Sequence, residues 1–253
     1  MNKKEALFAY TSRLGDNALI LSHRLAELCS KAPFIEEDLA QTNISLDLIG
    51  RAQALLKYAG EIEGNNRTED DLAYRREEKE YHNNLITEQP NKDFASVITR
   101  QLFISAFEFY FFTELEKSKD QTLAAIASKT VKEVKYHLQH ASDWTVRLGD
   151  GTNESNSRTQ KAVNNLWMYT GELFEMDGGD HLLLSEGIAA DTIPIKAQWM
   201  EYITLVLKEA NLTIPQESYM QTGAASKGIH SENLGHILAE MQYLQRAYPD
   251  AKW

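Results

Sequence analysis

A histidine at position 137 stands on a strongly helical stretch, three residues after an apolar valine, Val134. In four-helix bundles that bind two metal ions, a Glu-x-x-His pair on one helix points a carboxylate and an imidazole toward the interior. Here the imidazole is present and the carboxylate is missing. A second helical stretch carries Asp47, but Gly50 stands where the paired histidine would be. A chain with this layout and so few ligands resembles the partner of a catalyst more than the catalyst itself.

The rest of a dinuclear site is equally incomplete. Such a site needs about six ligands from four helices, four carboxylates and two histidines. The inward face of the first helical stretch offers Leu21, and that of the third offers Ser105. Half a ligand set leaves an ion poorly neutralised and weakly held. We therefore expect no metal here, with His137 and its neighbour Glu133 as hydrogen-bonded residues at the edge of the core.

Arg51 projects from the inward side of the second stretch, one turn after Asp47. A guanidinium there could neutralise buried acids such as Asp47 or Glu133 without any metal ion. The alternative is a surface arginine whose aliphatic stem lies along the helix. The sequence leaves both interpretations open.

The third helical stretch carries large apolar residues around most of its circumference. A helix of this kind is buried on more than one side, and the core of a bundle covers only one. The other side needs the C-terminal helices or another chain as a cover, and a large apolar interface is typical of obligate complexes. The residues that we take as a candidate interface are Phe103, Phe107, Tyr110 and Phe111.

Other chemical motifs are weak. The phosphate-binding and nucleotide-binding glycine patterns and the Gly-x-Ser-x-Gly nucleophile turn are absent. Cys29 lies in an apolar helical context, which is typical of a core residue. In the triplet after Ile229, Ser231 is expected to cap a helix that starts at Glu232, with His230 before it. The charge-dense run over residues 70–80 is expected to be a solvated helix with paired charges.

Helical period dominates the chain, and no segment alternates as a strand would. Four long helices in two pairs, joined by a crossover over residues 61–92, match the connectivity of ferritin-like folds. We expect an all-α fold, a ferritin-like four-helix bundle with additional C-terminal helices. One domain over residues 1–253 is expected, with a core bundle at 3–148 and a packed extension at 149–253. The predicted helices span residues 3–30, 35–60, 93–118, 120–148, 155–175, 191–210 and 231–247.

Charge and composition indicate which classes of partner and which cellular compartment to expect. The 37 acids against 26 bases give a net charge of −11, which opposes nucleic acid as a partner. The single Cys29 fits a reducing compartment. The N-terminal residues lack the apolar core of a signal peptide, and no apolar run is long enough to span a bilayer. We expect a cytoplasmic protein without a membrane anchor.

Three segments give the chain a likeness to a known family. They are Asp70-Asp71-Leu72-Ala73-Tyr74-Arg75 running on to Glu88-Gln89-Pro90-Asn91, Leu166 to Phe174 (LWMYTGELF), and Gly228 to Gly235 (GIHSENLG) with Leu238-Ala239-Glu240-Met241-Gln242. Through these segments the chain resembles the C-subunit family of bacterial phenylacetyl-CoA 1,2-epoxidases, multicomponent ring epoxidases of aerobic phenylacetate degradation. The likeness covers essentially the whole chain, including the terminal Trp253.

The resemblance implies a ferritin-like, structural and non-catalytic subunit that binds no cofactor itself. It implies pairing with the homologous catalytic subunit of the epoxidase, which holds the diiron centre and the acyl-CoA substrate. It also implies bridging and reductase subunits that carry flavin, iron–sulfur groups and electrons from NADPH. By the resemblance, the six ligand places of the catalytic subunit are occupied here by Leu21, Asp47, Gly50, Ser105, Val134 and His137.

Three functions therefore stand beside one another. The first is an obligate subunit of an oxygenase without chemistry of its own, which pairs with the catalytic subunit and could also self-associate. The second is a self-sufficient diiron or dimanganese oxidase, and the third is a helical adaptor protein unrelated to oxygenases. Val134 and Gly50 favour the first over the second, and the three segments separate the third from both. The oxidase would have to use Asp47, Glu108, Glu133 and His137.

Overall fold

A computed structural model describes residues 1–216, 219–249 and 251, so Trp253 lies outside the described residues. Within them the chain is all-helical and no strand occurs, which confirms the predicted all-α class. The chain divides into two compact units that are described separately. Unit 1 comprises residues 1–90, 177–183 and 223–253, and unit 2 comprises residues 91–176 and 184–222. The expectation of a single domain with its core at residues 3–148 stays a prediction.

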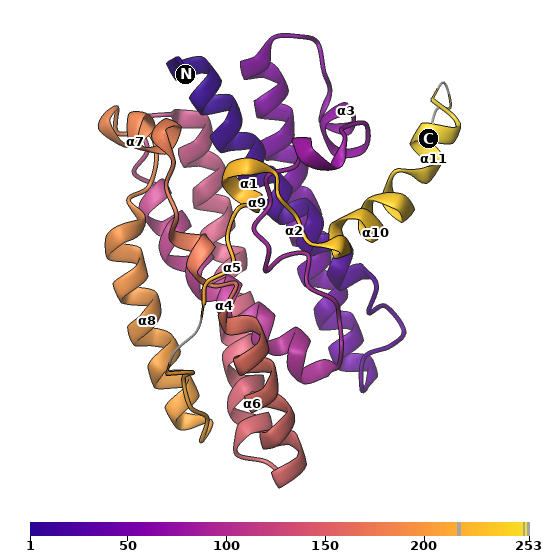
Figure 1. Ribbon diagram of the computed structural model, residues 1–253, viewed down its shortest axis with the longest axis vertical. Coiled ribbons are helices and arrows are strands. Elements are labelled where there is room, and N and C mark those ends of the chain that lie inside the picture. The colour runs from indigo at the N-terminus through magenta and orange to yellow at the C-terminus, as the bar shows by residue number, and fades with distance from the viewer. Residues whose placement is uncertain (217–218, 250, 252–253) are drawn as a thin grey trace. The chain divides into compact units, whose positions relative to one another are not determined.

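Unit 1 is built on a long helical pair, α1 (Lys3–Ala26) and α2 (Ile35–Glu63), labelled in Figure 1. The pair packs closely because Gly15 has no side chain, and a Cβ atom there would lie 2.7 Å from Leu56 Cδ2. Reciprocal hydrogen bonds from the Ser22 and Ser45 hydroxyls to each other's carbonyls, both 2.9 Å, join the two helices. The shorter helices of this unit are α3 (Glu69–Tyr74), α9 (Ala224–Lys227), α10 (Glu232–Met241) and α11 (Tyr243–Ala247), with a 3₁₀ turn, η1, at Glu78–Glu80.

Unit 2 is built on α4 (Phe94–Leu115) and α5 (Gln121–Gly149). Each begins at an aspartate, Asp93 and Asp120, whose side chain accepts a hydrogen bond from a free backbone N–H of the first turn. Covering helices α6 (Asn153–Trp167) and α8 (Thr192–Glu209) pack on this pair, and a 3₁₀ turn, η2, spans Gly171–Phe174. The short helix α7 (Gly178–Ser185) belongs to unit 1 up to residue 183, and its last two residues belong to unit 2.

The aromatic residues of α4 lie inside unit 2. Phe103 and Phe111 are buried, and the Phe103 ring contacts the rings of Trp167 on α6 and Trp199 on α8. Phe107 packs edge-on against Phe174 of η2, and Tyr110 packs against Tyr202 of α8. Of the two covers that the sequence allows, helices of the same chain therefore supply the one seen here. Phe103, Phe107 and Phe111 of the candidate interface are thus buried within unit 2 and Tyr110 is half-buried, and a role of these residues in binding another chain stays a prediction.

Two further expectations need correction. The first helix ends at Ala26 and not near residue 30, because turns follow directly after it. Cys29 lies in this turn region and is exposed, so the expectation of a core cysteine is wrong. None of the helices formed by the described residues is both long and apolar enough to cross a membrane.

Candidate functional site

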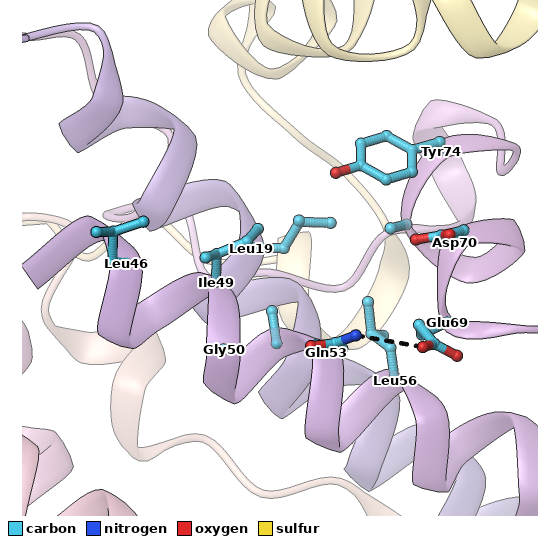
Figure 2. A pocket seen from close by; sticks show the side chains of 11 residues that line it. Leu19, Leu46, Ile49, Gly50, Gln53, Leu56, Glu69, Asp70 and Tyr74 are labelled. Atoms are coloured by element: carbon cyan, nitrogen blue, oxygen red, sulfur yellow. Dashed lines mark hydrogen bonds between the residues drawn. The ribbon is translucent and has the colours of Figure 1, made fainter. Parts of the chain in front are cut away.

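The predicted ligand places of unit 1 lie on α1 and α2. Leu21 is buried, whereas Asp47 and Gly50 are partly exposed. Gly50 lines a pocket of about 310 Å³ together with Leu46 and Ile49 of α2 and residues of α3 (Figure 2). A Cβ atom at Gly50 would meet no atom within 4 Å. A side chain at position 50 would therefore enter open space at this pocket.

The predicted ligand places of unit 2 lie on α4 and α5. Ser105, Val134 and His137 are all buried, and Val134 is completely enclosed. Val134 and His137 are one helical turn apart, so the sequence pattern does place both in the interior. An isopropyl group nevertheless offers no donor atom to an ion. Of the six places that the resemblance gives, four carry residues without a carboxylate or an imidazole, namely Leu21, Gly50, Ser105 and Val134.

The two residues that we considered as charge substitutes differ in environment. Arg51 is buried and has interaction partners, which excludes the interpretation as an exposed surface arginine. Glu133 is half-buried and forms an ion pair with Lys129 on the next turn toward the N-terminus, at 3.4 Å. Among the described residues, no group of three or more His, Cys, Asp and Glu side chains is arranged to hold a metal ion. A diiron centre therefore does not fit the side chains at the six places that the resemblance gives, all of which lie within the described residues.

A buried ion pair in unit 1 was not expected from the sequence. The Asp16 carboxylate on α1 binds the Arg76 guanidinium, which also donates to the carbonyls of Leu72 and Glu80. Asp16 is fully enclosed and Arg76 almost so. Burial alone would lower the pKa of Arg76, but the charge and hydrogen bonds of Asp16 outweigh it and raise that pKa. Asp16 also accepts a hydrogen bond of 2.9 Å from the backbone N–H of His82.

Tyr81 and Gln242 extend this cluster to the end of α10. The Arg76 guanidinium lies 4.2 Å from the centre of the Tyr81 ring. The Tyr81 hydroxyl donates to the Ala73 carbonyl and accepts a 2.8 Å hydrogen bond from the Gln242 amide. The same amide donates to the carbonyl of Arg76 at 2.9 Å. Burial raises the pKa of Tyr81, so the phenol remains a hydrogen-bond donor at neutral pH.

A second buried pair joins Glu88 to His230. Both side chains are fully enclosed, and His230 Nδ1 lies 3.1 Å from Glu88 Oε2. The other ring nitrogen, Nε2, lies 2.8 Å from the Tyr81 carbonyl oxygen. Both neighbours are hydrogen-bond acceptors, so the geometry suits an imidazolium with two donors. Burial alone would lower the pKa of His230, but the hydrogen bonds to Glu88 and Tyr81 and the Glu88 charge raise it.

The Glu88 carboxylate also holds the start of α10. Its Oε1 accepts a 2.7 Å hydrogen bond from the backbone N–H of Ser231, and Oε2 accepts one from the Asn83 amide at 3.2 Å. Ser231 is the N-cap of α10, as the sequence predicts. Arg24 of α1 donates to the carbonyls of Glu88 and Asn233 at 3.0 and 3.2 Å. The cluster therefore fixes the segment before Pro90 and the start of α10 onto α1.

No nucleophile with an adjacent base or open substrate site is evident in this cluster, because its groups are enclosed and bonded to one another. We call it the unit 1 clamp, and it comprises Asp16, Arg24, Arg76, Tyr81, Asn83, Glu88, His230, Ser231 and Gln242. The sequence signal for it was weak, because its members are far apart in the chain. The hydrogen bonds and ion pairs of the clamp hold segments of unit 1 that are remote in the sequence against one another.

The family model of the phenylacetic acid catabolic proteins matches residues 1–253 of the chain. The chain belongs to this family. A similar family member is the Escherichia coli (strain K12) protein described as the C subunit of 1,2-phenylacetyl-CoA epoxidase, which is 49% identical over 247 residues. These residues are 98% of the present chain and 99% of the relative. The resemblance seen in the sequence is thereby confirmed.

Two of the three segments that carry the family resemblance meet in the unit 1 clamp. The first segment contributes Glu88 and the third contributes His230, Ser231 and Gln242. The second segment supplies Trp167 and Phe174 to the aromatic interior of unit 2. Residues of all three segments therefore take part in the packing of the two units, and Asp70, Ala73 and Tyr74 of the first also line the pocket beside α2.

Proposed function

We propose that this chain is a structural, non-catalytic subunit of a multicomponent phenylacetyl-CoA epoxidase in phenylacetate degradation. It pairs with and stabilises a diiron catalytic subunit. The observation that carries the proposal is the donor set: of the six ligand places given by the resemblance, only Asp47 and His137 carry a metal-ligating side chain. The relative's description as the C subunit of an epoxidase supports the assembly.

The finer points belong to the same proposal. The fold is of the ferritin-like type, with the α1–α2 and α4–α5 pairs as the bundle helices. The diiron centre, flavin, iron–sulfur groups and NADPH reside in the partner subunits, and this chain binds none of them. The support for this division is chemical, because Val134 is enclosed and apolar and position 50 has no side chain.

The first test is metal content. The purified chain, expressed in iron-rich medium, is expected to hold far less than one iron per chain, since two ligands do not neutralise and hold a dinuclear site. His137→Ala should leave that value unchanged. About one iron per chain or more, lost in His137→Ala, would contradict the proposal and favour a self-sufficient oxidase.

The second test separates assembly from catalysis. His137→Gln should keep both binding to the catalytic subunit and epoxidation by the assembled complex, with a stability loss of about 1–2 kcal/mol for a buried polar group. Binding is measured by sedimentation beside turnover of phenylacetyl-CoA. A variant that assembles normally but supports no turnover would place His137 in the chemistry and overturn the non-catalytic role.

A further inference from the structure

Helix α2 carries large apolar side chains on a face opposite to its packed one. Ile35, Leu39 and Leu46 are 76%, 58% and 61% exposed. At about 100° per residue these three positions lie within about 40° of one line along the helix. Isolated apolar residues are normal on a surface, but an aligned set beside a pocket indicates a binding surface. We call Ile35, Leu39 and Leu46 the α2 outer stripe.

The stripe runs into the pocket between α2 and α3. Leu46 belongs to both, and Figure 2 shows it in line with Ile49 and Gly50 along α2. Leu19, Leu56 and Ala73 supply apolar wall, and the absent side chain at Gly50 leaves room on the α2 side. A volume of about 310 Å³ suits a large apolar anchor side chain, the kind that contributes most to protein interfaces.

The charge of the pocket selects the partner. Its charged lining residues, Glu69 and Asp70, are both acids. Glu69 accepts a hydrogen bond of 3.4 Å from the Gln53 amide across the pocket, and Asp70 is exposed. A partner that buries the stripe beside these carboxylates needs Lys or Arg next to its apolar face. A second copy of this chain in a symmetric contact would bring acids toward acids, which is unfavourable.

We propose that the α2 outer stripe and its pocket dock an amphipathic helix of the catalytic subunit of the epoxidase, with a large apolar anchor and flanking Lys or Arg residues. The α2 outer stripe would contact the partner helix along its apolar face, and the pocket would enclose the anchor side chain of that helix. Glu69 and Asp70 would form ion pairs with the Lys or Arg residues beside the anchor. This rests on the proposed function, because the epoxidase assembly supplies the partner. A small ligand would fill the pocket and leave the stripe uncovered.

The test uses two matched exposed leucines in the full-length chain. Leu46→Glu changes the stripe, and Leu205→Glu changes α8 in unit 2, where the leucine is 60% exposed. The probe is the purified catalytic subunit of the epoxidase from the same organism, with affinity measured by sedimentation. Leu46→Glu should weaken binding at least about 30-fold, the loss typical of an interface hot spot. Leu205→Glu should bind like the unmodified chain, and circular dichroism should show both variants folded.

A second pair of variants tests the charge. Glu69→Gln with Asp70→Asn should weaken binding by about threefold to tenfold and flatten its salt dependence, because these carboxylates lie at the rim. Glu154→Gln on α6, an exposed acid in unit 2, is the control and should change neither. A photo-crosslinker at position 46 should capture a segment of the catalytic subunit that contains Lys or Arg beside apolar residues.

Each outcome has one meaning. If the unmodified chain binds the catalytic subunit and Leu46→Glu binds equally well, the docking surface is wrong and the proposed function stands. If the unmodified chain binds no epoxidase subunit, the proposed function fails and this docking fails with it. Crosslinking of position 46 to a second copy of the chain, or to an acidic segment, would overturn the stated partner chemistry while leaving the epoxidase assembly intact.

Discussion

The two units of the molecule fill their interiors differently. Unit 1 encloses two ion pairs, Asp16–Arg76 and Glu88–His230, in one polar cluster. Unit 2 encloses a cluster of rings around Trp199, with Phe103, Trp167 and Phe174 in contact with it. Rings contribute burial of apolar area and bring little electrostatic cost. Buried ions cost desolvation and must be satisfied in one arrangement.

The polar interior of unit 1 and the aromatic interior of unit 2 fix the positions of their packed elements through different interactions. The clamp holds loops and short helices, which bury too little apolar surface to be positioned by packing alone. Directional hydrogen bonds to Asp16 and Glu88 fix their positions instead. In unit 2 long helices meet along apolar faces. Hydrogen bonds to backbone carbonyls accompany the rings, among them those from Trp199 Nε1 to Phe103 at 2.9 Å and from Thr192 Oγ1 to Phe174 at 2.8 Å.

The largest effect is expected from breaking the ion pair of the clamp on one side. Arg76→Met leaves the Asp16 carboxylate enclosed without its counter-charge and should lower the free energy of unfolding by about 3–5 kcal/mol. Urea unfolding at pH 7 measures it. The double variant Asp16→Leu with Arg76→Met should lose less than Arg76→Met alone, because no buried charge then remains. Equal losses would mean that the pair itself is not the source of the stability.

The stabilisation that the Glu88–His230 pair provides should depend on pH. The pKa of His230 in the folded chain lies above its ordinary value of 6.5, so folding favours its protonated form. Its stabilisation is complete below pH 6.5 and is lost as the pH rises through the raised pKa. His230→Gln should therefore lose about 1.5–3 kcal/mol at pH 6, the range for a charged hydrogen bond, and less at pH 9.

Two other histidines act in the opposite direction. Burial lowers the pKa of His23 and of His82, so these groups destabilise the folded chain as the pH falls below 6.5. The difference between His230→Gln and the unmodified chain at each pH cancels their effect. A difference that stays constant from pH 6 to pH 9 would contradict a protonated His230 in the clamp.

A smaller and pH-independent effect is expected in the aromatic interior of unit 2. Trp199→Phe removes the N–H donor to the Phe103 carbonyl and part of the ring, with a loss of about 1–2 kcal/mol. Thermal unfolding at pH 6, 7 and 9 should give the same loss. A loss that varies with pH would show that unit 2 shares the electrostatic dependence of unit 1.

The smallest effect is expected for an exposed ion pair, which serves as the reference for the buried pairs. Arg158 donates to Glu154 on the preceding turn of α6 at 2.6 Å, and both side chains are exposed. Arg158→Gln should leave the free energy of unfolding unchanged within the error of the measurement, since exposed pairs are screened by solvent. A loss comparable with that of Arg76→Met would remove burial as the reason for the contrast between pairs.

The long helices could be predicted from the sequence because their signals are local. Period and caps placed α2, α4, α5 and α8 within a few residues of their observed bounds, and Ser231 was recognised as an N-cap. The short α7 and α9 were not predicted, because helices of eight and four residues carry little periodic signal. The charge-dense run over residues 70–80 was predicted as one helix, but α3 covers only its first part and ends at Tyr74. Phe174 was placed in a long helix that instead ends at Trp167 and resumes as a 3₁₀ turn.

The clamp could not be predicted, because its partners are remote in the chain. The charge-dense run was expected to be a solvated helix, and Arg75 does pair with Asp71 in that way at 3.2 Å. Its neighbour Arg76 instead turns inward to a carboxylate 60 positions earlier. Glu88 and His230 are separated by 142 positions. No local pattern distinguishes Arg75 from Arg76, and only the fold assigns them opposite environments.

The order in which unit 1 is assembled has a consequence for synthesis. The α1–α2 pair leaves the ribosome early, but Asp16 and Glu88 belong to a cluster that His230 and Gln242 complete. All of unit 2 is made before these two residues appear, because it ends at residue 222. Contacts between residues so far apart in the chain slow folding, and the residues made first stay exposed until their partners have been synthesised. During synthesis the Glu88 carboxylate therefore lacks its partners His230 and Ser231 until the last segment of unit 1 emerges, whereas unit 2 can close first.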